Sequence, residues 1–76
     1  MDKFIELFAE AMEMKITDVK PSDKFRDYEE WDSLAALSML AMINENYEVT
    51  IPRRDFEEVQ TVSGLYDLIM EMKREK

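Results

Sequence analysis

The chain has 76 residues, with 18 acidic against 10 basic side chains, a formal charge of −8, and neither cysteine nor histidine. This composition excludes disulfides and thiol chemistry and removes the commonest general base, so catalysis by the chain itself is not expected. An acidic surface repels phosphate backbones and anionic lipids, which favours a basic protein partner over nucleic acid or a membrane.

The length allows one domain, residues 1–76, which we expect to be a monomer. No apolar run approaches the length of a membrane span, and no basic-then-apolar secretory leader opens the chain. Together with the absence of cysteine, these features predict a cytoplasmic protein.

Apolar residues with helical spacing open the chain and predict a first helix over about residues 2–14. Its stripe consists of Phe4, Ile5, Phe8, Ala11 and Met12. The periodicity is lost over residues 15–31, which predicts a long irregular connector. Three apolar residues are expected to anchor this connector to the core, namely Ile16, Val19 and Phe25. Unusually long loops in small domains often carry function.

A second helix is predicted to begin at Ser33 and to run to about Tyr47. Its expected buried stripe consists of Leu34, Leu37, Leu40, Ala41 and Ile43. Most of the remaining circumference is apolar too, with Ala35, Ala36, Met39 and Met42. No charge occurs between Ser33 and Asn44, although 37% of the chain is charged. Such a helix is either central to the bundle or uses part of its surface to meet a partner.

Pro52 ends this pattern, and a short third helix is predicted over about residues 54–59, with Phe56 and Val59 facing inward. Thr61 is expected to cap a last helix. The inward stripe of that helix consists of Val62, Leu65, Leu68, Ile69 and Met72, and its end carries the cations Lys73, Arg74 and Lys76. The sequence thus predicts an all-α fold, a small four-helix bundle with a long loop between helices one and two and a short third helix.

A serine opens the uncharged helix directly after an acidic run, in the segment Glu30-Trp31-Asp32-Ser33-Leu34. One interpretation is structural, because Ser and Asp are favoured helix caps. The other is chemical, because the amides and the positive dipole end of a helix N-terminus suit a phosphate ester. Spacing alone does not decide between them.

The run Asp32-Ser33-Leu34 resembles the phosphopantetheine attachment motif of acyl carrier proteins. The resemblance continues in register through residues 43–52, which are similar to the end of that family's second helix and the segment up to its proline. Residues 55–62 are similar to the short third helix and to the Thr-Val pair that starts the fourth. Residues 4–12 fit the first helix.

The resemblance implies a covalent 4'-phosphopantetheine arm, moved from coenzyme A to the Ser33 hydroxyl by a phosphopantetheinyl transferase. Acyl ligases, acyltransferases or synthase enzymes of fatty acid or polyketide biosynthesis would then use the arm's thiol to carry acyl groups as thioesters. Asp32 would help the transferase to engage, and Leu34 would be the first apolar contact after the serine. The resemblance implies no catalytic residue in the chain itself. No metal site is expected, because Cys and His are absent and the acids from Asp23 to Asp32 lack the alternation and the central glycine of an EF-hand.

Departures from the family pattern predict the partner surface and the cargo. Many members have acidic residues on the second helix where this chain has Ala35 and Ser38. We therefore expect an apolar docking face formed by Ala35, Ala36, Met39 and Met42. Arg53 and Arg54 replace an acidic pair and are expected to form a further partner surface. Phe56 replaces a small residue, which predicts a short or polar cargo.

Two departures concern the ends of the second helix. Glu48 stands where the family commonly has a helix-ending glycine, so a left-handed cap at this residue would be strained. Trp31 stands beside the serine in place of a small residue and is expected to pack against the connector.

Two alternatives stay open. A peptidyl or aminoacyl carrier would hold the same arm, although such carriers more often have Gly-Gly-His before the serine, whereas Asp32 favours the acyl type. An unmodified helical interaction module would bind a partner through its Met-rich helix, and its mass would not change in the presence of coenzyme A and a transferase.

Overall fold

The structure is a computed structural model that describes residues 2–74. Over this range it contains four α-helices and no strand: α1 (Asp2–Met12), α2 (Ser33–Tyr47), α3 (Arg53–Glu58) and α4 (Val62–Arg74). Two 3-10 turns, η1 (Ile16–Asp18) and η2 (Phe25–Asp27), interrupt the connector between α1 and α2. The predicted all-α bundle with a long connector and a short third helix is confirmed. Lys76, expected at the end of the last helix, lies outside the described residues.

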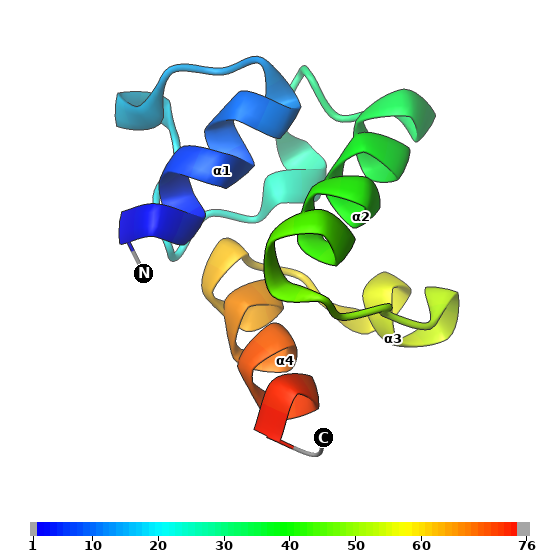
Figure 1. Ribbon diagram of the computed structural model, residues 1–76. Helices are drawn as coiled ribbons and strands as arrows, with labels where there is room; N and C mark the ends of the chain where they lie inside the picture. The colour runs from blue at the N-terminus through cyan, green and yellow to red at the C-terminus, as the bar shows by residue number, and fades with distance from the viewer. Residues whose placement is uncertain (1, 75–76) are drawn as a thin grey trace.

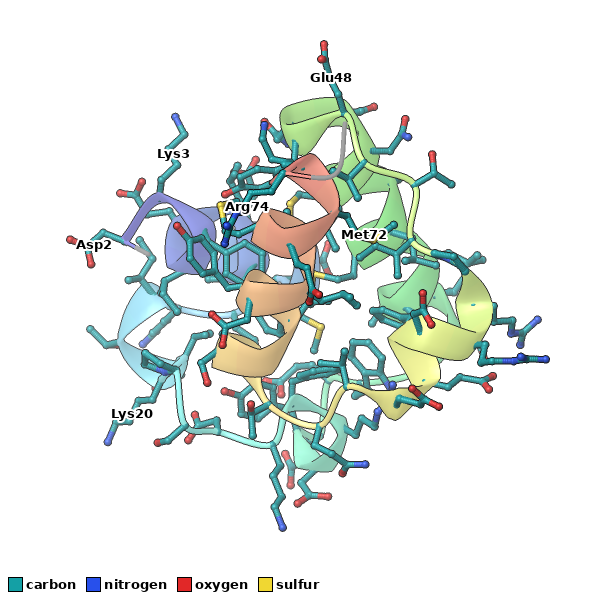
Figure 2. The ribbon with its side chains drawn as sticks, turned by 90° about the horizontal axis from the view of Figure 1, so that it is seen from below. Asp2, Lys3, Lys20, Glu48, Met72 and Arg74 are labelled. Carbon is teal, nitrogen blue, oxygen red and sulfur yellow. The ribbon has the colours of Figure 1, made fainter. Side chains whose placement is uncertain are left out.

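The helices enclose one apolar core, and α1 and α3 lie at opposite sides of the molecule in both views (Figures 1 and 2). The largest fully buried side chains are Phe4, Phe8, Phe25, Met39, Ile43, Val49, Val62, Leu65 and Ile69. A chain of edge-to-face ring contacts crosses this core, with centroids 5.9 Å apart for Phe4 and Phe8 and 5.8 Å apart for Phe8 and Phe25. None of the described helices is long and apolar enough to cross a membrane.

Both α1 and α2 end at a glutamate in the left-handed conformation. After α1, Glu13 has φ 57°, its amide donates to Glu10 O at 3.1 Å, and the Met14 amide donates to Ala9 O at 2.8 Å. This pair of bonds closes the helix at Met12, slightly before the predicted end. After α2, Glu48 has φ 56°, the left-handed conformation that is strained for a residue other than glycine, and its side chain extends away from the helices in Figure 2.

The connector supplies hydrogen-bond partners to the start of α4. The Val62 amide donates to Asp23 O at 3.1 Å, and the Ser63 amide donates to Pro21 O at 2.8 Å. The Gly64 amide donates to Thr61 Oγ1 at 3.0 Å, which confirms Thr61 as the cap. All three first-turn amides of α4 therefore have an acceptor.

Two of the three expected connector anchors are buried. Val19 is 5% exposed and Phe25 is 0% exposed, as predicted, but the expectation for Ile16 is wrong, since its side chain is 51% exposed. Ile16 lies in η1, a single turn too short to turn every apolar side chain toward the core. On the polar side of the connector, the Tyr28 hydroxyl donates to Asp23 Oδ2 at 2.6 Å. Burial, followed by this hydrogen bond, raises the pKa of the Tyr28 hydroxyl.

Candidate functional site

Ser33 is the first residue of α2, and its hydroxyl is available for chemistry. The capping residue is Asp32, which has extended backbone angles and accepts a 2.7 Å hydrogen bond from the Ala35 amide at its Oδ1. The helix-capping role therefore belongs to Asp32 rather than to Ser33. Ser33 is exposed, and its hydroxyl makes no hydrogen bond to any described residue.

Two backbone amides at the start of α2 precede the first hydrogen bond within the helix. The first helical bond runs from the Ala36 amide to Asp32 O at 3.0 Å, so the amides of Ser33 and Leu34 have no intrahelical acceptor. These amides and the helix dipole favour negative charge at this point. The arrangement fits a phosphate ester carried by Ser33 Oγ.

A groove of about 690 Å³ begins beside Ser33 and passes between α2, η2 and α3. Its lining combines apolar side chains of α2 with aromatic rings and two arginines. The lining residues are Arg26, Trp31, Asp32, Ser33, Ala36, Leu37, Leu40, Ile51, Arg53, Phe56 and Glu57. The volume lies in the range of small-molecule sites.

Two aromatic rings, those of Trp31 and Phe56, form one wall of this groove, and the buried Phe25 ring packs against both. Trp31 lies 4.9 Å from Phe25 and 6.0 Å from Phe56, measured between ring centroids. The contact with Phe25, a connector residue, confirms that Trp31 packs against the connector. Phe56 is 4% exposed, so its ring fills space that a smaller side chain would leave open.

The predicted orientation of α2 is wrong in its first two turns. Leu34 and Leu37 were expected in the core, but they are 73% and 64% exposed. Ala41 is exposed as well, Leu40 is half-buried, and only Ile43 of the predicted stripe is fully buried. Because both sides of the helix are apolar, periodicity did not identify the side that meets the core.

The expected apolar docking face is mostly inside the molecule. Ala35, Met39 and Met42 are all buried, and Met39 is completely so, because unbranched methionine fills irregular core space well. Placing these three residues on the surface was therefore wrong, while Ala36 is half-buried at the groove. The exposed apolar pair beside the serine is instead Leu34 and Leu37.

The spacing of Leu34 and Leu37 was the available signal for this pair. Residues three apart share one face of a helix, and both leucines follow Ser33 within the first two turns of α2.

The two arginines of the other expected partner surface, Arg53 and Arg54, are exposed. Arg53 pairs with Glu57 at 3.4 Å, which leaves Arg54 as the cation of α3 without an ion-pair partner among the described residues. Residues 2–74 contain no cluster of three or more acidic, His or Cys side chains suited to a metal ion.

Comparison with known proteins matches this site to one family. The family model described as the phosphopantetheine attachment site matches residues 2–69. Acyl carrier proteins of Chlorobium phaeovibrioides and Chlorobium luteolum are each 29% identical to the chain over 69 residues, which cover 91% of this chain and 88% of each relative. The acyl carrier protein of Chlorobium phaeobacteroides is 28% identical over the same coverage. The chain therefore belongs to the phosphopantetheine-binding family of carrier proteins, whose prosthetic group is a covalently attached 4'-phosphopantetheine.

Proposed function

We propose that this protein is an acyl carrier protein that holds acyl groups as thioesters on an arm attached at Ser33 and presents them to biosynthetic enzymes. The observation that carries the proposal is the Ser33 hydroxyl, exposed and without a hydrogen bond at the start of α2. It follows a separate capping residue, Asp32, so the serine has no structural task at the helix end. The family match covers this position.

The chain's own residues contribute a position and an electrostatic environment. Ser33 Oγ would bear the phosphate ester, and the amides of Ser33 and Leu34 would face its negative charge. Serine is a weak nucleophile at neutral pH, so the base and the metal ion for attachment belong to the phosphopantetheinyl transferase. When bound, the arm supplies the thiol that a chain without cysteine lacks. Presentation of a tethered cargo then works through high effective concentration.

The surface around Ser33 suits docking of basic enzymes. Leu34 and Leu37 offer an apolar contact beside the serine, and Asp32 offers a carboxylate. A net charge of −8 steers cationic partners and speeds their association. The proposed partners are the transferase and the acyl ligases, acyltransferases or synthases that load and use the cargo. Arg54 would mark a second contact on α3.

The attachment is tested by the intact mass of the purified protein after incubation with coenzyme A and a broad-specificity transferase. The wild type is expected to gain one phosphopantetheine group, whereas Ser33→Ala gains none. Ser38→Ala is the matched control, because Ser38 is an exposed serine of the same helix, and it should be modified like the wild type. A folded wild type that several transferases leave unmodified would overturn the proposal.

A further inference from the structure

The short helix α3 is weakly held by its own residues. It has six residues, its N-cap Pro52 makes no side-chain capping bond, and Phe56 is its one buried side chain. A helix of this length is not stable by itself, because too few hydrogen bonds offset the cost of starting it. Contacts from other elements must therefore hold α3 in place.

Arg26 provides such a contact from the distant turn η2. Its Nε donates to Val59 O at 3.1 Å, and its Nη2 donates to Phe56 O. These carbonyls are at the C-terminal end of α3, where a cation complements the dipole; the Phe56 carbonyl also accepts the Val59 amide at 3.3 Å. The planar guanidinium can engage both carbonyls at once, which a lysine cannot reproduce.

The same guanidinium lies against the two rings of the groove wall and against the buried Phe25 ring. Its central carbon is 5.2 Å from the centroid of Phe25, 5.8 Å from that of Trp31 and 5.4 Å from that of Phe56. These distances are those of cation–π contacts. No carboxylate of residues 2–74 forms an ion pair with Arg26, so its partners are ring faces and backbone carbonyls.

We propose that Arg26 is a latch that holds α3 against η2, keeps the Phe56 ring in the groove wall and thereby limits the cargo to short acyl groups. The inference rests on the proposed function for its cargo, but the latch itself is a property of the unmodified protein. A longer chain entering the groove beside Ser33 meets the Trp31–Phe56 wall. To be shielded from solvent, a longer chain would have to pass behind this wall, which requires α3 to move away from η2, and the latch opposes that movement.

Hydrogen exchange of the unmodified protein tests the latch directly. Arg26→Met removes the donors and keeps much of the aliphatic length, and Arg54→Met is the matched control at an exposed arginine of α3. We expect the amides of Phe56 and Val59 to exchange about tenfold faster in Arg26→Met, equivalent to about 1.4 kcal/mol, with α1 and α2 unchanged. Arg26→Lys, a second variant, should show a smaller increase.

Unchanged exchange in Arg26→Met, or an equal increase in Arg54→Met, would overturn the latch. A wild type whose Phe56 and Val59 amides already exchange at unprotected rates would overturn it too. Circular dichroism and a cooperative thermal transition establish that each variant is folded before exchange is compared.

Thioester protection tests the limit on the cargo. Butyryl and decanoyl arms are loaded at Ser33 from the corresponding coenzyme A thioesters, and cleavage by hydroxylamine is followed by intact mass. The wild type and Arg54→Met should lose both acyl groups at similar rates, whereas Arg26→Met should lose the decanoyl group several-fold more slowly. Protection of the decanoyl group in the wild type, or no change in Arg26→Met, contradicts the limit. Failure to load any arm overturns the proposed function, and the exchange result then decides the latch alone.

Discussion

Two of the helices within residues 2–74, α2 and α4, contain a serine in the first turn, and their starts are built differently. At the start of α4, the connector and Thr61 supply acceptors for all three first-turn amides, and Ser63 is half-buried with its Oγ 3.4 Å from Thr61 Oγ1. At the start of α2, Asp32 satisfies only the third amide, and the Ser33 hydroxyl is exposed. A serine at a helix start is thus a candidate attachment site only where the helix end is open.

The largest expected effect comes from comparing two side chains of α2, one buried in the core and one exposed near Ser33. Met39→Ala should lower the free energy of unfolding by about 2–5 kcal/mol, because it empties a completely buried position. Leu37→Ala should change it by less than about 0.5 kcal/mol, since the side chain is largely exposed. Instead, Leu37→Ala should slow modification of Ser33 by the transferase. Urea unfolding and transferase kinetics measure the two effects, and similar stability losses in both variants would contradict the orientation of α2.

The next effect compares the caps of the two helix starts. Asp32→Ala and Thr61→Ala should each cost about 1 kcal/mol of stability, because each removes the side-chain acceptor of a first-turn amide. Asp32→Asn should keep stability within about 0.5 kcal/mol, since Asn caps as well as Asp, yet slow the transferase through loss of the carboxylate. Thr61→Ala should leave the rate of modification unchanged. Equal loss of modification in the two alanine variants would remove the distinction between the helix starts.

The smallest expected effect is the pH dependence of stability that arises from Tyr28, which binds the side chain of Asp23 in the connector beside α4. The pKa of Tyr28 is raised above its ordinary value of 10.0 by burial and by the hydrogen bond to Asp23. The folded state therefore favours the neutral hydroxyl, so the stability that it contributes is complete below pH 10 and is lost as the pH rises through and above this value. From about pH 9 to about pH 11, the wild type should lose more unfolding free energy than Tyr28→Phe. Parallel losses in the two proteins would contradict a role for Tyr28.

Local signals predicted the helices well. Asp32 and Thr61 are capping residues next to apolar periodicity, and the bounds of α2 and the cap of α4 agree with the sequence. Glu48 stands where the family commonly has a helix-ending glycine, and it does adopt the left-handed conformation. Each of these features depends on neighbours within a few residues, which a single sequence displays.

Features that depend on distant residues were not predictable in the same way. The orientation of α2 depends on which apolar side packs against other helices, so Leu34 and Met39 were placed on the wrong sides. Arg26 binds the carbonyls of Phe56 and Val59. Every residue has a backbone carbonyl, so the sequence does not indicate which ones a distant side chain binds. The bonds that the Val62 and Ser63 amides donate to the Asp23 and Pro21 carbonyls could not be predicted for the same reason.

Peptide mass mapping after incubation with coenzyme A and a transferase tests the contrast between the two helix starts most directly. The account predicts phosphopantetheine on the peptide that contains Ser33 and none on the peptide that contains Ser63. An adduct at Ser63, or a folded protein with no adduct at Ser33, would contradict it.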